Sequence, residues 1–204
     1  MKLSSQEIFW KGSFGKNYIE RNKSKKLAKE TDVFFERIFR KNNIKISSII
    51  ELGSNIGNNL KSLSKIFKKA ELSAVEINEK ACHELKKRNP KVNIINQSLI
   101  SVDVQSKFDL VLTKGVLIHI NPKQLNKVYE QINKISKKYI LIAEYYNITP
   151  INVTYRGKKD KLFKRDFAGE LIKRFNYKII DYGFVYRYDK FPQDDITWFL
   201  LKKK

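Results

Sequence analysis

Residues 49–57 read Ile49-Ile50-Glu51-Leu52-Gly53-Ser54-Asn55-Ile56-Gly57. An apolar strand here runs into an acidic residue and then into a turn with two glycines. The residues that follow repeat apolar side chains at helical spacing. These are Leu60, Leu63, Ile66 and Phe67. Strand, tight turn and helix are the opening unit of a doubly wound α/β sheet, in which ligands bind beyond the carboxyl ends of the strands.

The turn excludes two common phosphate-binding motifs. A dinucleotide fingerprint needs glycine where this chain has Asn55 and Asn58, and no Lys-Ser or Lys-Thr pair follows to form a P-loop. Glu51 would also repel a pyrophosphate, whereas its carboxylate suits a cationic ligand. A buried strand that merely ends in a polar turn is the simpler alternative.

The same turn resembles motif I of the class I S-adenosylmethionine-dependent methyltransferases, written acid-x-Gly-x-x-x-Gly. Glu51, Gly53 and Gly57 match the motif, and Asn55 departs from it where many members have glycine. Asparagine tolerates left-handed backbone better than most residues do. The resemblance implies S-adenosylmethionine as cofactor and S-adenosylhomocysteine as product.

Composition indicates one compact domain. The chain has 204 residues, 42% of them hydrophobic, and no apolar run long enough to span a membrane. No signal peptide is visible at the start of the chain. A single cysteine, Cys82, excludes an internal disulfide and fits a reducing cytoplasm, so we expect a cytoplasmic location. The sequence does not indicate an oligomeric state.

The net charge is +21, from 42 basic and 21 acidic residues. Such a balance suggests a nucleic-acid partner. The lysines are spread over most of the expected helices, however, and the chain is rich in Asn and Ile, a bias that AT-rich coding can produce. Solvated helix faces and a small anionic substrate are the favoured explanation, and a nucleic-acid partner remains possible.

The second expected strand, 72–77, also ends in an acid. Glu76 lies 25 residues after Glu51, close to the spacing at which an acid at the end of the second strand accepts hydrogen bonds from ribose hydroxyls. Capping of the next helix is the alternative role. Ile77 belongs to the same expected cofactor site. After a third strand, 92–95, Ser98 stands where many methyltransferases contact the adenine.

The fourth and fifth expected strands, 108–113 and 138–143, are followed by polar residues. Lys114 and Gly115 follow the first of them and are expected to bind the cofactor. His119, slightly further on, is a candidate base for the acceptor or a histidine packed in the turn. Glu144 is the alternative base. The next two residues, Tyr145 and Tyr146, are expected to contact the substrate.

The N-terminal segment, 1–44, is unusually aromatic. We expect it to form a helical lid over the domain formed by 45–204, although a helix simply packed on the core fits equally well. Three of its residues are assigned to the cofactor, with Arg21 gripping a carboxylate: Trp10, Tyr18 and Arg21. Phe14 is assigned to the substrate.

The C-terminal part is expected to complete the sheet. An irregular insert around 149–160 and a helix contain three further candidate substrate contacts, Tyr155, Arg156 and Arg165. Strands at 177–187 and 196–201 are joined by a short loop and therefore run antiparallel. In that loop, Asp194 and Asp195 suggest a turn or a substrate hydroxyl contact rather than a metal site. The result is a seven-stranded Rossmann-like sheet with an antiparallel last strand.

Several blocks together resemble the pseudaminic acid biosynthesis-associated methylase family. They are residues 9–15, 51–57, 114–122, 144–147, 155–157, 165–168 and 194–199. The resemblance implies a small methyltransferase acting on a nonulosonic acid or nucleotide-sugar in a surface-glycan pathway, by in-line attack of an oxygen or nitrogen on the methyl group. An RNA or protein methyltransferase and a non-catalytic S-adenosylmethionine-binding partner protein are the alternatives.

Overall fold

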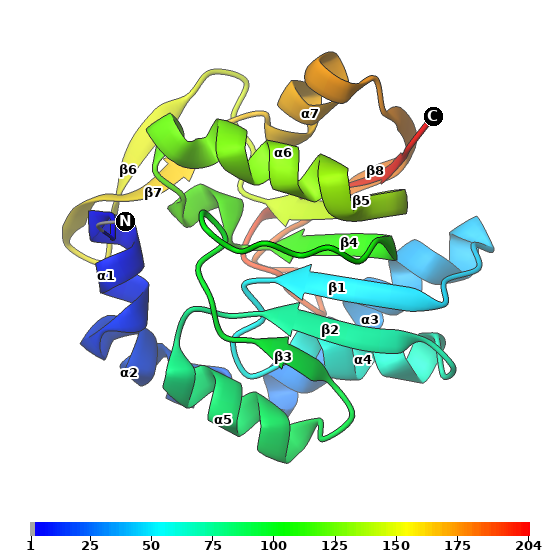
Figure 1. Ribbon diagram of the computed structural model, residues 1–204, viewed down its shortest axis with the longest axis horizontal. Coiled ribbons are helices and arrows are strands. Elements are labelled where there is room, and N and C mark those ends of the chain that lie inside the picture. Colours follow the sequence, from blue (N-terminus) through cyan, green and yellow to red (C-terminus); the bar gives the residue numbers. More distant parts are fainter. Residues whose placement is uncertain (1–2) are drawn as a thin grey trace.

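A central sheet with helices on both faces makes up most of the protein (Figure 1). The computed structural model describes residues 3–204. Three helices precede the first strand, and strands and helices then alternate as far as the third strand. The helices are α1 (Ser5–Lys11), α2 (Ser13–Arg21), α3 (Lys25–Asn42), α4 (Asn58–Ile66), α5 (Glu79–Arg88), α6 (Leu125–Ile135) and α7 (Phe167–Phe175), with short 3₁₀ turns at Leu117–His119 and Pro122–Gln124.

The main sheet has seven strands in the order β3-β2-β1-β4-β5-β9-β8. Their bounds are β1 (Ser48–Leu52), β2 (Glu71–Val75), β3 (Asn93–Ile95), β4 (Phe108–Lys114), β5 (Ser136–Glu144), β8 (Lys178–Val185) and β9 (Ile196–Lys202). Only β9 runs antiparallel to its neighbours β5 and β8. The predicted seven-stranded α/β sheet with an antiparallel last strand is confirmed.

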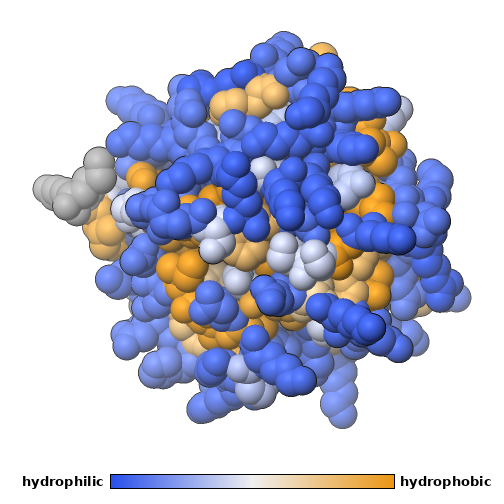
Figure 2. All heavy atoms as spheres, turned by 45° about the vertical axis from the view of Figure 1, so that its right-hand side comes forward, coloured by the Kyte–Doolittle hydropathy of each residue, from blue (hydrophilic) through white to orange (hydrophobic). Residues whose placement is uncertain are grey.

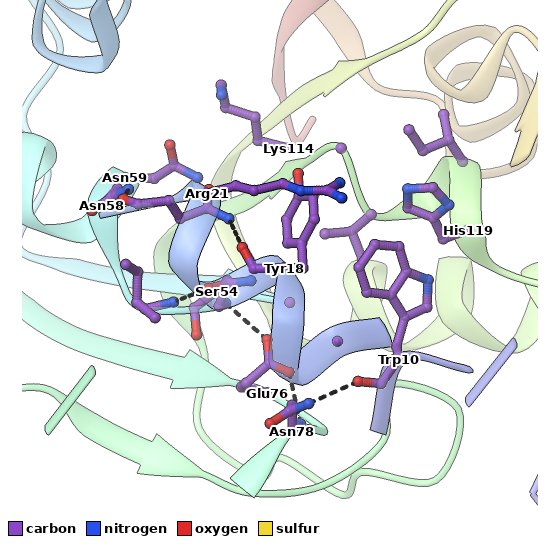
Figure 3. A pocket seen from close by; sticks show the side chains of 18 of the residues that line it. Trp10, Tyr18, Arg21, Ser54, Asn58, Asn59, Glu76, Asn78, Lys114 and His119 are labelled. Atoms are coloured by element: carbon purple, nitrogen blue, oxygen red, sulfur yellow. Dashed lines mark hydrogen bonds between the residues drawn. The ribbon is translucent and has the colours of Figure 1, made fainter. Parts of the chain in front are cut away.

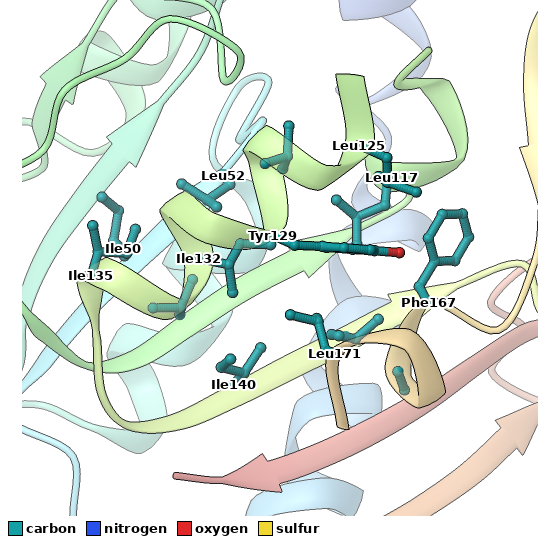
Figure 4. Packing of buried hydrophobic residues seen from close by; sticks show 14 of the residues in the cluster. Ile50, Leu52, Leu117, Leu125, Tyr129, Ile132, Ile135, Ile140, Phe167 and Leu171 are labelled. Atoms are coloured by element: carbon teal, nitrogen blue, oxygen red, sulfur yellow. The ribbon is translucent and has the colours of Figure 1, made fainter. Parts of the chain in front are cut away.

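One face of the sheet is covered by α6 and α7. Helix α6 presents Tyr129, Ile132 and Ile135 to the strands, where they pack with Ile50 and Ile140 (Figure 4). The Tyr129 hydroxyl donates to Glu170 Oε2 at 2.7 Å, which satisfies the polar end of a ring that is otherwise in the core. This layer fixes the direction of β4 and β5, whose ends reach the site.

Helix α3 covers the other face. Its side chains Phe34, Phe35 and Ile38 are buried against β1 and α4 residues such as Ile49 and Leu60. The helix begins after Ser24, which accepts from the Leu27 amide, and ends at Asn43 in the left-handed conformation. Residues 25–42 are thus part of the sheet's packing, whereas α1 and α2 lie at the carboxyl ends of the strands (Figure 1).

The expectation of an irregular insert after residue 149 is wrong. The segment forms a two-stranded antiparallel hairpin, β6 (Ile151–Tyr155) and β7 (Lys158–Lys164), turning at Arg156 and Gly157. Both turn residues have positive φ, at 49° and 75°, which the sequence indicated only through Gly157. The next helix begins later than expected, because Asp166 caps it and Arg165 precedes it.

Hydrophilic side chains cover most of the face shown in Figure 2, with smaller hydrophobic patches between them. Within residues 3–204, no helix is both long and apolar enough to cross a bilayer.

Candidate active site

The carboxyl ends of β1, β2 and β4 open into a cavity of about 490 Å³. Residues from α1, α2, α3, the hairpin and the β8–β9 loop close its other sides. Figure 3 shows Glu76 and Asn78 on one side of this cavity, Lys114 and Arg21 on another, and Trp10 beside His119. The topology predicted this location, since the strand order changes direction between β1 and β4.

The turn after β1 has the backbone that its sequence predicted. Gly53, Asn55 and Gly57 all have positive φ, at 75°, 48° and 77°. A Cβ on Gly53 would lie 2.6 Å from a methyl group of Val116, so this position requires glycine both for its conformation and for its space. The asparagine at position 55 therefore occupies the left-handed backbone, as expected.

Glu76 lies at the end of β2 and is held by the backbone of two turns. Its Oε2 accepts from the Asn55 amide at 2.8 Å, and its Oε1 accepts from the Asn78 amide at 2.7 Å. Burial raises the pKa of this carboxyl, an effect that the two amides oppose. A carboxylate oxygen has more than one acceptor site, so each oxygen can still accept from a ligand hydroxyl. Ile77, also expected to bind the cofactor, lines the cavity beside it.

Glu51 lies behind the cavity rather than in its wall. It is buried and accepts a hydrogen bond from Asn59 Nδ2 at 2.5 Å, while its Oε2 has no partner among the described residues. Burial raises its pKa to about 8. The assignment of Glu51 as a direct cofactor contact is corrected: it orients Asn59, and Asn59 lines the cavity.

Ser98 lines the cavity after β3, but its hydroxyl is engaged. Ser98 donates to the Glu7 carboxylate from α1 and accepts from the Ile100 amide at 3.2 Å. Glu7 also completes a capping box with Ser4 at the start of α1. The sequence did not point to Glu7, although the Ser4–Glu7 spacing is a capping-box signature.

Helices α1 and α2 bring three predicted residues to the cavity, namely Trp10, Tyr18 and Arg21. The Arg21 guanidinium lies 5.9 Å from the ring centre of Tyr18, and no ion pair of Arg21 is found within residues 3–204. Asn78 Nδ2 donates to the Trp10 carbonyl at 2.9 Å and so ties α1 to the end of β2. Phe14 does not line the cavity, because its ring stacks on Phe9 at 4.0 Å.

His119 lines the cavity and is 7% exposed. Its Nδ1 lies 2.6 Å from the Lys161 carbonyl of β7, which can only accept, so Nδ1 carries the proton and Nε2 is left as an acceptor. Burial lowers its pKa to about 4, although the bond to Lys161 acts in the opposite direction. The ring centre lies 4.6 Å from that of Trp10. The imidazole is therefore neutral at pH 7 and has one fixed tautomer.

Glu144 is not available as a base. Its carboxylate accepts from the amides of Val116 at 3.0 Å, Leu117 at 3.1 Å and Ile118 at 3.4 Å, and it does not line the cavity. Burial raises its pKa to about 7, an effect that these amides oppose. The assignment of Glu144 to proton removal is corrected, because its oxygens hold the turn that contains His119.

Lys114 and Gly115 both line the cavity, as expected of them. Gly115 has φ of 66°, and a side chain there would meet open space, so its backbone conformation alone favours glycine. The Lys114 ammonium lies 5.5 Å from the ring centre of Phe34. Burial lowers the pKa of Lys114, and Glu51, Glu144 and Asp194 counter the shift.

The predicted substrate contacts divide into two groups. Tyr145, Tyr155, Arg156 and Asp194 line the cavity. Two others do not. Tyr146 is 41% exposed and lies against Phe199, 6.4 Å between ring centres, and Arg165 Nε donates to Glu170 Oε1 at 2.6 Å. Arg165 stabilises the start of α7 and is removed from the substrate site, as is Tyr146.

Residues 49–138 match the protein family described as a methyltransferase domain. A magnesium protoporphyrin IX methyltransferase from Synechocystis PCC 6803, solved with S-adenosylhomocysteine, superposes with a TM-score of 0.74 at 11% identity, over 97% of each chain. A 1,6-didemethyltoxoflavin-N1-methyltransferase from Burkholderia thailandensis, also solved with S-adenosylhomocysteine, gives 0.72 at 12% identity, over 100% of this chain and 92% of that one.

A third structure, an S-adenosylmethionine-dependent methyltransferase from Clostridium acetobutylicum ATCC 824, gives a TM-score of 0.67 at 14% identity, over 93% of this chain and 97% of that one. The fold is that of the class I methyltransferases. No curated protein sequence matches the chain.

The methyltransferase fold accounts for the turn and for Glu76. The sequence did not indicate that these further residues would line the cavity: Gln6, Glu7, Glu30, Asn78 and Gln193. All are polar and buried, and each comes from an element whose packing angle decides what its side chains face. Among residues 3–204, no cluster of three or more His, Cys, Asp or Glu side chains could hold a metal ion.

Proposed function

We propose that this protein is an S-adenosylmethionine-dependent methyltransferase with a small, anionic, sugar-like acceptor, of the nonulosonic acid or nucleotide-sugar type. The observation that carries the cofactor assignment is Glu76, which lines the cavity with both oxygens already oriented by the amides of Asn55 and Asn78. The methyltransferase-domain match over residues 49–138 supports the same assignment.

The residues present fit this cofactor on structural grounds. Ser54, in the turn after β1, lines the cavity, and its Oγ is buried without a partner in the described part of the chain. Glu76 accepts from the ribose hydroxyls, and Ile77 and Ser98 flank the adenine. Arg21 pairs with the methionyl carboxylate, aided by the Lys114 ammonium. Bound S-adenosylmethionine supplies a methyl group on an electrophilic sulfonium.

Catalysis then depends mainly on alignment. The cavity walls would hold the acceptor oxygen or nitrogen against the methyl group of the cofactor, which would remove most of the entropic cost of bringing them together. The cofactor would supply the methyl group and leave as S-adenosylhomocysteine, and the proton of an acceptor hydroxyl would be lost to water. His119 Nε2 accepts a hydrogen bond from an acceptor hydroxyl and orients its lone pair. With a pKa of about 4, the imidazole is a weak proton acceptor.

The acceptor end is formed by later parts of the chain. Tyr145, Tyr155, Arg156 and Asp194 line the cavity. Arg156 and the positive field of the protein suit an acidic group on the acceptor, while Asp194 and the tyrosine hydroxyls suit sugar hydroxyls. Helices α1 and α2, within the segment 1–44, act as the lid over the domain 45–204. The buried free thiol of Cys82 suits a reducing, cytoplasmic setting.

Calorimetry with S-adenosylhomocysteine tests the cofactor assignment. Glu76→Ala is expected to weaken binding roughly 10- to 100-fold, since two hydrogen bonds to a charged group are lost. Glu79→Ala, an exposed carboxyl in the first turn of α5, is the matched control and should bind as the wild type does. Equal affinity of Glu76→Ala and wild type would remove Glu76 from the ribose site.

Mass spectrometry tests the acceptor. A nonulosonic acid, its nucleotide-activated form and an uncharged sugar of similar size are each incubated with the enzyme and S-adenosylmethionine. A gain of one methyl on an acidic sugar alone is the expected result. Methylation of the uncharged sugar would contradict the anionic class, and cofactor binding without any methylated product would favour a non-catalytic binding partner.

A further inference from the structure

Four buried polar atoms in the cavity wall have no partner among residues 3–204, namely Trp10 Nε1, Glu30 Oε1, Ser54 Oγ and Gln193 Nε2. Two of these residues, Glu30 and Gln193, have no role in the site described above. Glu30 from α3 is 8% exposed, and Gln193 from the β8–β9 loop is 5% exposed. Glu30 Oε1 and Gln193 Nε2 form no hydrogen bond with any residue in 3–204. An orphaned buried polar atom costs roughly 1–3 kcal/mol, so such atoms at a cavity point to a ligand.

The orphaned atoms of Glu30 and Gln193 are of opposite kinds. A carboxylate oxygen only accepts hydrogen bonds, and an amide nitrogen only donates them. The nearest cation to Glu30 is the largely exposed Lys26, whose Nζ lies 4.0 Å from Oε1, too far for a hydrogen bond. A ligand that satisfies both atoms offers a donor to Glu30 and an acceptor to Gln193.

Cations of the cavity surround the same region. Glu30 lies one helical turn before Phe34, whose ring centre is 5.5 Å from Lys114 Nζ, so Glu30 shares the Lys114 side of the cavity. Arg21 approaches the same side from α2 (Figure 3). A ligand ammonium bound in this cavity needs an acidic partner, and a ligand carboxylate has Arg21 and Gln193 among the lining residues as donors.

We infer that Glu30 and Gln193 recognise the amino-acid end of the cofactor as a zwitterion, with Glu30 accepting from the α-ammonium and Gln193 joining Arg21 on the α-carboxylate. This rests on the proposed function, which assigns the ribose and adenine contacts to other residues, Glu76, Ile77 and Ser98. It makes α3, a core helix, and the β8–β9 loop part of the cofactor site.

Three ligands separate the two groups. S-adenosylhomocysteine has both the ammonium and the carboxylate, its decarboxylated amine keeps only the ammonium, and 5′-methylthioadenosine has neither. Glu30→Gln should weaken the first two about tenfold or more and leave 5′-methylthioadenosine unchanged. Gln193→Ala should weaken S-adenosylhomocysteine alone. Glu36→Gln, an exposed carboxyl on the same helix, is the matched control.

Thermal unfolding without ligand completes the test. Because the Glu30 oxygen is orphaned, Glu30→Gln should unfold at the same temperature as wild type or higher, whereas a purely structural role predicts a lower one. Equal weakening of all three ligands, or unchanged affinity for S-adenosylhomocysteine, would overturn the inference. Failure of wild type to bind any of the three would instead overturn the proposed function.

Discussion

Single residues differ in how far the sequence reveals their roles. The left-handed backbone of Asn55 and the position of Glu76 in the cavity were predictable, because a left-handed turn and an acid at a strand end follow from local sequence. Glu144 was not. It ends a buried strand beside the site, and whether such a side chain faces the cavity or the neighbouring loop depends on the path of residues 116–118. The hydrogen bond of Arg165 could not be foreseen for a similar reason, since its partner Glu170 lies one turn into the next helix.

His119 is the residue whose chemistry can be measured most directly. His119→Ala should lower kcat about 10- to 100-fold and leave the affinity for S-adenosylhomocysteine within twofold, because the imidazole orients the acceptor rather than the cofactor. Steady-state kinetics measure kcat, and calorimetry measures the affinity for S-adenosylhomocysteine. Unchanged kcat would remove His119 from the catalytic step.

The pH dependence follows from the direction of the His119 shift. Its folded pKa of about 4 lies below the ordinary 6.5, so between these values the unfolded chain binds a proton that the folded chain does not. The contribution of His119 to stability is therefore complete above pH 6.5 and is lost as pH falls towards 4. The difference in unfolding free energy between wild type and His119→Ala should shrink as the pH falls over that range. In the pH–rate profile of the wild type, titration of His119 should cause no change in turnover near pH 6.5.

Among the elements, strands were predicted best and the N-terminal helices least well. Apolar runs followed by turns marked all seven strands of the sheet, whereas the hairpin β6–β7 is largely exposed and polar and lacks that pattern. The aromatic segment 9–18 indicated contact with a ligand or the core. Its actual position depends on distant partners such as Asn78, which no local pattern reveals.

Gly15 of α2 packs against the Trp10 carbonyl of α1, and it provides a test of the lid. A Cβ there would lie 1.8 Å from the Trp10 carbonyl and 2.8 Å from Asn78 Nδ2. Gly15→Ala should therefore displace α1 and weaken S-adenosylhomocysteine binding several-fold, while the sheet stays intact. Hydrogen exchange should rise in residues 5–21 and stay unchanged in β1, β4 and β5. Lys16→Ala, exposed on the same helix, is the control, and unchanged exchange in both variants would contradict the packing role of Gly15.

At the scale of the whole molecule, the two core layers explain why the sheet is rigid enough to carry the site. Residues of β1 and β4 contribute to both hydrophobic clusters, one on each face, so the strands whose ends form the cavity are the most deeply buried. The apolar runs of the sequence predict the burial of these strands. The net charge of +21 lies outside this core, so it bears on which partners the protein binds.

The dependence on salt concentration distinguishes the two acceptors that such a charge suggests, a small anionic molecule and RNA. A small anionic acceptor is steered by the overall field, so its KM should rise modestly with salt while kcat stays constant. RNA bound through many phosphates should lose affinity by orders of magnitude between about 50 and about 200 mM salt. With labelled S-adenosylmethionine and a mixture of RNA and acidic sugars at about 150 mM salt, a typical physiological ionic strength, we expect label in the small-molecule fraction only. Label in the RNA fraction would reverse the choice of acceptor and assign the positive surface to nucleic-acid binding.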